Sequence, residues 1–129
     1  GVEFGEKGRI GIEVAVGAGE NWDELVRLCV DKNLYGLENL SGIPGSVGAG
    51  PVQNIGAYGC QLSDTLTTLE AFDLETKQLV TLRASDCAFG YRTSRFKTSD
   101  KGRFFITSIT INCTNFYFIK LLLFIFSIL

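Results

Sequence analysis

The chain has 129 residues, and its composition, with 46% hydrophobic, 20% charged and 12% aromatic residues, is that of a globular domain or of part of one. Twelve lysines and arginines against fourteen aspartates and glutamates give a net charge of −2, which excludes the basic surface that most nucleic-acid-binding domains need. The absence of histidine excludes serine–histidine and cysteine–histidine catalysis within this chain and removes the commonest metal ligand, so no metal site is expected.

The first predicted elements are a strand over residues 9–16 and a helix over residues 22–31. Apolar residues occupy alternate positions of the strand segment, which predicts one buried face formed by Ile10, Ile12, Val14 and Val16. The apolar residues of the helix segment follow the i, i+3, i+4, i+7 spacing: Trp22, Leu25, Val26 and Cys29. Asn21 is the predicted N-cap, with Glu24 three residues later, and Asn33 is the predicted left-handed terminator.

Residues 36–59 form an unusual segment that reads GLENLSGIPGSVGAGPVQNIGAYG. It contains seven glycines and both prolines, and its only charged residue is Glu38. Apolar residues are interleaved with the glycines, which predicts an ordered, partly buried loop rather than a flexible linker. The backbone N–H groups of residues 45–50 are candidates for a nest that binds phosphate, although a tight connection that binds nothing fits the glycine content equally well. Neither a Walker-type nor a Rossmann-type glycine motif is present.

The second half of the chain predicts a hairpin, a loop and a final strand. Residues 65–74 and 78–83 are strand-like and are separated by a short turn, which indicates an antiparallel pair. The loop at 90–97 reads GYRTSRFK and mixes aromatic with cationic side chains. Residues 104–111 are apolar and β-branched, as in a buried strand. A helix combined with antiparallel strands predicts an α+β fold.

The four cysteines, Cys29, Cys60, Cys87 and Cys113, form no C-x-x-C pair. Without such a pair, and without histidine, a structural zinc site is not expected. We favour reduced, structural thiols and a cytoplasmic location, because the sequence shows neither a signal peptide nor a cysteine-dense framework; a disulfide pair remains open.

The composition changes abruptly in residues 115–129. From position 116 they read FYFIKLLLFIFSIL, which is shorter than the ~20 residues that cross a bilayer. We favour an out-of-frame or misassembled end, and a buried strand or the start of a truncated membrane segment remain as alternatives. Residues 1–114 are then expected to form a partial domain, with 115–129 outside the native fold. The lack of methionine likewise indicates a fragment.

Three blocks carry a family resemblance: GAGENW at 17–22, ENLSGIPGSVGAGPVQNIGAYG at 38–59 and FGYRTSRFK at 89–97. In this order and spacing they resemble the UDP-N-acetylenolpyruvoylglucosamine reductases, and the likeness extends over about residues 9–111. The resemblance implies part of an FAD-binding domain of the p-cresol methylhydroxylase type. It also implies a cytoplasmic, monomeric flavoenzyme that reduces a UDP-sugar with NADPH in peptidoglycan synthesis.

The resemblance also assigns the FAD contacts. Ile43 and Pro44 would lie along the flavin, and Ala49, Val52 and Gly56 would present backbone groups to FAD. Many relatives carry serine at the position of Ala49, so one hydroxyl contact would be missing. The implied cofactor-binding residues are Ile43, Pro44, Gly45, Ser46, Val47, Gly48, Ala49, Gly50, Val52, Asn54 and Gly56.

The resemblance assigns substrate binding to Tyr58, Tyr91 and Arg92, and makes Arg92 the catalytic residue. A guanidinium group can hold the enolpyruvyl carboxylate through two hydrogen bonds and stabilise the charge that develops there as hydride arrives. Without the resemblance, Arg92 would be interpreted as a partner in a surface ion pair. Arg95 and Lys97 are expected to be solvated or to steer phosphate rather than to act in catalysis.

The chain departs from the family's pattern in three places. It lacks the earlier G-G-G-S-N-type segment, the later N-x-G-S segment whose serine donates a proton, and the glutamate near the family's C-terminus. These absences indicate that the chain alone is inactive. Two other interpretations stay open: a catalytically inactive remnant that at most binds a nucleotide, and a membrane-tethered interaction module.

Overall fold

The computed structural model describes residues 1–6, 8, 11–115 and 124–128. Its main sheet has the strand order β1-β2-β8-β6-β7, and every neighbouring pair is antiparallel. The strands are β1 (Val2–Phe4), β2 (Ile12–Gly17), β6 (Leu66–Asp73), β7 (Gln78–Arg83) and β8 (Phe104–Asn115), and the short β3 (Leu34–Tyr35) pairs with the end of β8. The α+β class expected from the sequence is confirmed.

Helix α1 (Trp22–Asp31) has the bounds that the apolar spacing predicts. The side-chain oxygen of Asn21 accepts the backbone N–H of Glu24 at 2.9 Å, so the predicted N-cap is confirmed. After the helix, Asn33 adopts the predicted left-handed conformation with φ of 58°. Trp22, Leu25, Val26 and Cys29 are buried and pack in the same core as the inward side chains of β2 and β8.

Strand alternation determines which side chains of the sheet are buried. Val14 and Val16 of β2, Leu69 of β6, and Ile109 and Ile111 of β8 are almost fully inaccessible and form the centre of the core. The hairpin β6–β7 is confirmed, and its turn is held by Asp73, whose carboxylate accepts the backbone N–H groups of Glu75 and Thr76. The register of the strands follows from the buried face, because a shift of one residue would move Val14, Leu69 or Ile109 out of the core.

Strand β8 is longer than the sequence predicts. It continues beyond residue 111 to Asn115, because Cys113 is buried opposite Ile12 and Asn115 pairs with Leu34. Asn115, which the sequence groups with the hydrophobic tail, is thus the last residue of β8. Most of the rest of that segment lies outside the described residues. Its described part, 124–128, is helical, with Phe124, Phe126 and Ile128 exposed.

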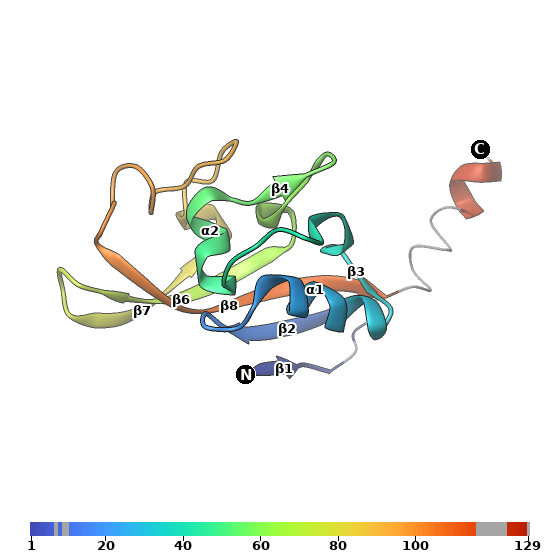
Figure 1. Ribbon diagram of the computed structural model, residues 1–129, viewed down its shortest axis with the longest axis horizontal. Coiled ribbons are helices and arrows are strands. Elements are labelled where there is room, and N and C mark those ends of the chain that lie inside the picture. Colours follow the sequence, from blue (N-terminus) through green and yellow to red (C-terminus); the bar gives the residue numbers. More distant parts are fainter. Residues whose placement is uncertain (7, 9–10, 116–123, 129) are drawn as a thin grey trace.

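The segment 36–59 lies on one side of the sheet, as Figure 1 shows for α2 (Gly50–Gln53) and β4 (Gly56–Ala57). Strand β4 pairs with β5 (Cys60–Gln61) in a small separate hairpin. Short 3-10 turns complete the region at Glu38–Leu40, Val47–Ala49 and Leu62–Asp64, and a fourth one, Ala84–Asp86, follows β7. The prediction of an ordered, partly buried loop is confirmed.

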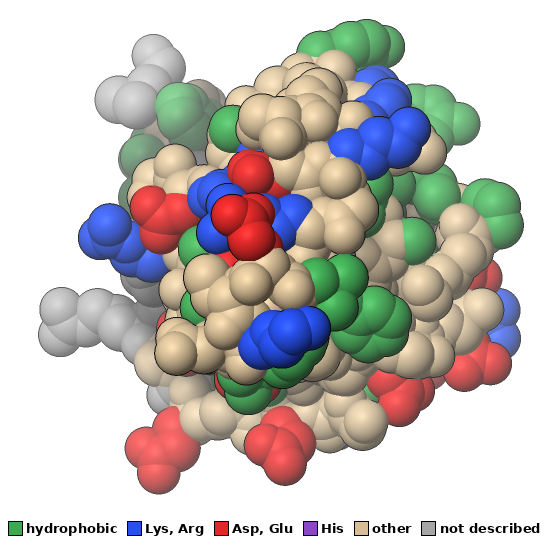
Figure 2. Space-filling view, turned by 90° about the vertical axis from the view of Figure 1, so that its left-hand side faces the viewer, with side chains coloured by type: hydrophobic (Ala, Val, Ile, Leu, Met, Phe, Trp, Pro, Cys, Tyr) green, Lys and Arg blue, Asp and Glu red, His purple; other side chains and the backbone are tan. Residues whose placement is uncertain are grey.

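Opposite charges meet at the end of the molecule that carries the β6–β7 turn and the start of β8 (Figure 2). Arg103 donates to Asp73 at 2.9 Å and also approaches Glu75 and Asp100. These contacts lower the pKa of the Asp73 carboxyl well below its usual range, chiefly through the hydrogen bonds from Arg103. The network therefore joins the turn to the start of β8.

Candidate functional site

The glycine-rich loop is built on contacts to the loop 17–22. The backbone N–H of Val47 donates to Glu20 at 2.8 Å, and that of Gly48 donates to Ala18 at 2.9 Å. A side chain at position 48 could not be accommodated here, because an added Cβ would lie 2.6 Å from the Cβ of Ala18. Two of the three sequence blocks thus form one packed unit.

The candidate phosphate nest at residues 45–50 has only some of its N–H groups available. The N–H groups of residues 47–50 are already used: those of Val47 and Gly48 as described, that of Ala49 by the Ser46 carbonyl, and that of Gly50 by the Val47 carbonyl. A nest needs successive N–H groups that are free to converge on an anion. Within the described part of the chain, the N–H groups of Gly45 and Ser46 have no backbone acceptor, so the loop offers fewer donors than its glycine content indicates.

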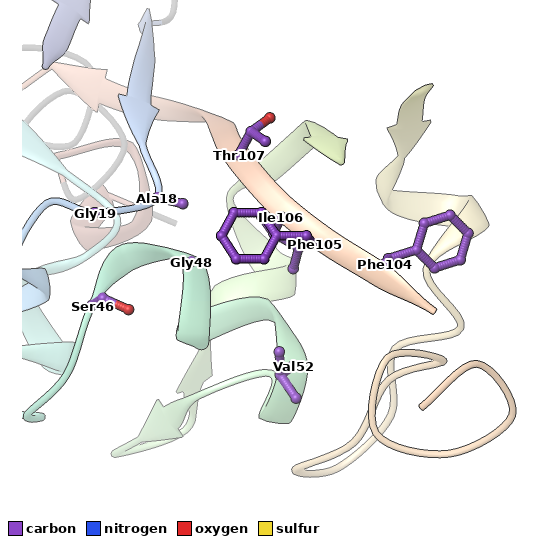
Figure 3. A pocket seen from close by; sticks show the side chains of 9 residues that line it. All are labelled: Ala18, Gly19, Ser46, Gly48, Val52, Phe104, Phe105, Ile106 and Thr107. Carbon is purple, nitrogen blue, oxygen red and sulfur yellow. The ribbon is translucent and has the colours of Figure 1, made fainter. Parts of the chain in front are cut away.

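A groove of about 510 Å³ lies between this loop and the start of β8. Figure 3 shows its two walls: Ala18, Gly19, Ser46, Gly48 and Val52 on the loop side, and Phe104, Phe105, Ile106 and Thr107 on β8. Most of the lining is apolar, whereas Ser46 and Gly19 contribute exposed polar groups at one side. Apolar walls with a few polar groups are typical of cofactor and ligand sites.

A smaller hollow of about 200 Å³ lies on the other side of the loop. It shares Ser46 with the groove, and its remaining lining residues are Trp22, Ile43, Pro44, Ala49, Gly50, Gln53 and Ile55. Seven of the eleven cofactor-binding residues implied by the resemblance thus line one of the two cavities: Ile43, Pro44, Ser46, Gly48, Ala49, Gly50 and Val52.

The other four implied residues are placed differently. Gly45 is exposed and has φ of +120°, and an added Cβ would meet nothing within 4 Å. Val47 and Asn54 are fully buried, so neither side chain can reach a ligand. The carbonyl of Gly56 accepts a hydrogen bond from Arg92. The implied set therefore contains residues that support the loop as well as residues that line its cavities.

The lining residues of the groove can be compared with the chemical groups of FAD. The small residues Ala18, Gly19 and Gly48 allow a ligand to approach the backbone, and Ser46 can donate through its hydroxyl and its N–H. The apolar wall around Phe105, which is 66% exposed, suits a flat ring. The residues present therefore fit part of FAD.

A third hollow, of about 450 Å³, brings together the three residues assigned to substrate binding. Tyr58, Tyr91 and Arg92 line it with Gly59, Cys60 and Gln61. Tyr58 and Tyr91 are 89% and 84% exposed, which is unusual for large aromatic side chains that serve only the core. The hollow lies between the β4–β5 hairpin and the loop 90–97.

Arg92 has a constrained position in this hollow. Its Nη2 donates to the Gly56 carbonyl at 2.7 Å, and its guanidinium carbon lies 4.8 Å from the centre of the Tyr91 ring. Its backbone has φ of 51°, an uncommon conformation for arginine. Among the described residues no carboxylate pairs with it, so the surface ion pair that sequence alone would suggest is not formed there.

Arg95 contradicts its prediction as a solvated charge. Its Nε donates to Asp100 at 2.8 Å, its Nη1 donates to the Asp86 carbonyl at 2.9 Å, and its side chain is 24% exposed. These bonds lower the pKa of the Asp100 carboxyl. Arg95 therefore supports the loop. Lys97 is exposed, and its Nζ donates to the carbonyl of Arg92 at 3.2 Å.

The four cysteines are free thiols in the structure. Burial raises the pKa of the Cys87 thiol to about 11, and the neighbouring Cys29 together with burial raises the pKa of the Cys113 thiol. In the described residues, no three His, Cys, Asp or Glu side chains come together to hold a metal ion. None of the helices that the structure describes has the length and hydropathy that a membrane-spanning helix requires.

Comparison with known proteins gives a consistent result. Residues 9–83 match the family described as FAD binding domain. The chain is 52% identical over 96 residues to the UDP-N-acetylenolpyruvoylglucosamine reductase of Alcanivorax borkumensis, which covers 74% of the chain and 28% of that protein. It is 49% identical over 113 residues to the same-named protein of Ralstonia nicotianae, which covers 85% of the chain and 33% of that protein.

A solved structure resembles the fold. The chain matches the UDP-N-acetylenolpyruvylglucosamine reductase of Thermus caldophilus with a TM-score of 0.69 and 28% identity, over 78% of the chain and 36% of that protein. The chain thus spans 28 to 33% of the length of these two curated relatives, and the likeness is confined to that part.

Proposed function

Because the chain belongs to the FAD binding domain family and, over the part that it spans, to the UDP-N-acetylenolpyruvoylglucosamine reductases, we propose that it supplies the substrate arginine and part of the FAD site of such a reductase. The proposed reaction is the NADPH-dependent reduction of UDP-N-acetylenolpyruvoylglucosamine to UDP-N-acetylmuramate, a step of peptidoglycan synthesis.

The observation that carries the proposal is the hollow around Tyr58, Tyr91 and Arg92. A single hydrogen bond to Gly56 fixes the guanidinium there, and the remaining N–H donors have no acceptor among the described residues. A guanidinium presents its five donors in a rigid planar fork, which suits a carboxylate. The enolpyruvyl carboxylate of the proposed substrate has the matching geometry and charge.

Arg92 would act most strongly when negative charge increases on that carboxylate. Addition of hydride to the enolpyruvyl double bond moves electron density toward the carboxylate, and a cation already in place stabilises this charge without reorganising. Tyr58 and Tyr91, both exposed at the hollow, would position the sugar portion through their hydroxyl groups and ring faces.

FAD would be held by the groove beside the glycine-rich loop and, when bound, would supply the hydride. Ser46 and Gly19 would contact its phosphate or ribitol groups, and Phe105 and Val52 would contact its ring systems. Further contacts to FAD would come from the adjacent hollow and its rim, through Ile43, Pro44, Gly45 and Ala49. Asn54 and Val47 have no place in this contact set because both are buried.

Several finer features belong to the same proposal. We propose NADPH as the hydride source, a cytoplasmic location and a monomeric enzyme without nucleic-acid or membrane partners. We also propose that the sheet through Asn115 forms part of an FAD-binding domain and that residues 116–129 are not native to it. By itself, the chain is proposed to bind FAD weakly and to lack activity.

The test places residues 1–111 into the complete Alcanivorax borkumensis relative in place of the matching segment. Arg92→Ala should slow substrate reduction by about 10²–10³ and leave flavin reduction by NADPH nearly unchanged, because one prepositioned donor is lost only from the substrate step. Arg92→Lys should recover little, since a single ammonium cannot form the two-point contact.

Stopped-flow absorbance of the flavin separates the two half-reactions. Arg27→Ala is the control: its side chain is 73% exposed on α1, and its removal should alter neither rate. Equal slowing of both half-reactions by Arg92→Ala, or an effect of Arg27→Ala of similar size, would show that Arg92 is not the carboxylate partner.

A further inference from the structure

Two loops that are far apart in sequence are joined by three hydrogen bonds at alternate residues. The Oγ of Ser94 donates to the Val52 carbonyl at 2.7 Å, and the Nδ2 of Asn54 donates to the Gly90 carbonyl at 2.9 Å. The Nη2 of Arg92 donates to the Gly56 carbonyl at 2.7 Å. Residues 52–56 thus hold residues 90–94 on both sides of Arg92.

Asn54 is the central member of this set. It is fully buried, and besides Gly90 its Nδ2 donates to Oε1 of Gln61 while its Oδ1 accepts the N–H of Ser63, both at 2.9 Å. A buried amide is costly unless it is hydrogen-bonded, and here both of its ends are used. Its side chain therefore serves the joint between the loops and has no group left for a ligand.

The backbone shows why the loop needs such a joint. The turn 90–93 closes through reciprocal bonds between Gly90 and Thr93, and Arg92 is its second central residue with φ of 51°. Arginine lacks glycine's freedom in this region, so the surrounding structure must impose the conformation. The turn begins at Gly90, and the carbonyl of this residue accepts the hydrogen bond from Asn54.

Gly56 completes the arrangement because it leaves room for the guanidinium. An added Cβ at position 56 would lie 2.4 Å from Nη1 of Arg92 and 2.6 Å from the carbonyl oxygen of Cys60. A larger residue at position 56 would thus push the arginine out of the hollow or open the β4–β5 hairpin.

We propose that Asn54 is a positioning residue that, together with Ser94 and Gly56, sets the place of the Arg92 guanidinium in the hollow beside Tyr58 and Tyr91. The proposal rests on the proposed function, which makes this guanidinium the binding group for the substrate carboxylate. It replaces the assignment of Asn54 to the cofactor with an action on the substrate arginine. Asn54 acts through the Gly90–Thr93 turn and does not contact the substrate.

The test uses the full chain labelled with ¹⁵N-arginine, with the Arg92 side-chain signals assigned from their loss in Arg92→Lys. Asn54→Gly removes the amide and keeps a residue that tolerates φ of 46°, so its effect reports the side chain. We expect the Arg92 guanidinium protons to exchange with water about tenfold faster and their chemical shifts to move, since the bond to Gly56 is weakened. The signals of Arg103, which binds Asp73, should stay in place.

Asn33→Gly is the matched control, because Asn33 has the same residue type and a similar φ of 58° but is exposed after α1. It should leave the Arg92 signals unchanged. Ser94→Ala removes the bond to Val52 together with the bond that Ser94 Oγ accepts from the Phe96 N–H, and it should raise the exchange rate about threefold. It tests the positioning role if Asn54→Gly does not fold.

Unchanged Arg92 exchange and shifts in the folded variants would overturn the positioning role. The proposed function is tested separately, by the two half-reaction rates of Arg92→Ala in the complete relative that carries residues 1–111. If the Arg92 signals respond to Asn54→Gly while Arg92→Ala leaves substrate reduction in the grafted relative unchanged, the positioning role stands and the proposed function is wrong.

Discussion

The sheet-and-helix body and the loop region above it share a hydrophobic core but differ in the further contacts that fix their backbones. In the body, buried aliphatic side chains of β2, β6 and β8 pack against α1, and backbone ladders connect the strands. The loop region, formed by residues 36–59 and 84–103, contributes buried side chains such as Leu37, Leu40 and Val47 to the same core. It adds long-range side-chain hydrogen bonds, such as those of Asn54, Arg92 and Ser94. Buried area stabilises both regions, and directed side-chain contacts additionally fix the backbone of the loops.

This difference determines where unusual backbone can persist. Of the six described non-glycine residues with positive φ, four lie in the loop region: Asn54, Tyr58, Ala88 and Arg92. Two of these four line the proposed substrate hollow. A strained backbone persists only where many surrounding contacts hold it in place. The loops that contain these residues are anchored on the packed body. Stability and site geometry should therefore respond to mutation in separable ways.

The largest effect is expected from a cavity in the body. Ile109→Ala removes a fully buried side chain from the central strand β8 and should lower the free energy of unfolding by about 2–5 kcal/mol. Urea unfolding followed by Trp22 fluorescence measures it, because Trp22 is buried where α1 meets the loops.

Thr110→Ala on the opposite face of β8 is the control and should cost less than about 1 kcal/mol. If Ile109→Ala and Thr110→Ala cost the same, burial of the body face would not be the main source of stability.

How much the sequence predicts follows the same division. The helix 22–31 and the β6–β7 hairpin were predictable because apolar spacing and turn residues are local signals. The end of β8 was missed because Asn112 and Thr114 interrupt the apolar run, although Cys113 between them is buried. The short strands β1 and β3 are too brief to show a period.

The site was predictable only in part, and for a different reason. The resemblance identified Tyr58, Tyr91 and Arg92, and the structure brings the three together. No local pattern shows that Asn54 bonds to Gly90 across 36 residues, or that Arg92 adopts a positive φ. Glycine content also does not reveal that the loop itself uses the N–H groups of Val47, Gly48, Ala49 and Gly50.

The next effect tests close packing inside the loop region. Gly48→Ala places a Cβ 2.6 Å from that of Ala18 and should cost about 1–3 kcal/mol, because two loops must separate. Gly19→Ala is the matched control: it lines the same groove, and its added Cβ meets nothing within 4 Å.

Gly19→Ala should change the stability by less than about 0.5 kcal/mol in the same urea assay. A tolerant position 48 would mean that the contact between the loops 17–22 and 45–50 is looser than the structure indicates.

A smaller effect concerns acid. Arg103 holds the pKa of Asp73 below its value in the unfolded chain, and Arg95 does the same for Asp100. Above a pH of about 4 these carboxylates are charged in both states, and their lowered pKa stabilises the folded chain. As the pH falls below about 4, the unfolded chain takes up protons before the folded chain does. The stabilisation is therefore lost progressively.

We therefore expect the urea midpoint to fall steadily as the pH is lowered below about 4. Asp73→Asn should make this dependence shallower. Asp31→Asn, at the exposed end of α1, should leave it as it is. An unchanged acid dependence in Asp73→Asn would show that the Arg103 network contributes nothing to the pH effect.

The smallest effect is expected at the end of the chain. Deleting residues 116–129 should change the free energy of unfolding by less than about 0.5 kcal/mol, because the described part of that segment exposes Phe124, Phe126 and Ile128 rather than burying them. Solubility should rise as these apolar side chains are removed. Deleting residues 112–129 is the informative contrast, since it also removes buried Cys113 and the pairing of β8 with β3. That longer deletion should cost several kcal/mol, in the range expected for loss of a buried side chain together with its strand contacts. A marked loss of stability from the shorter deletion would instead show that residues 116–129 bury area against the body.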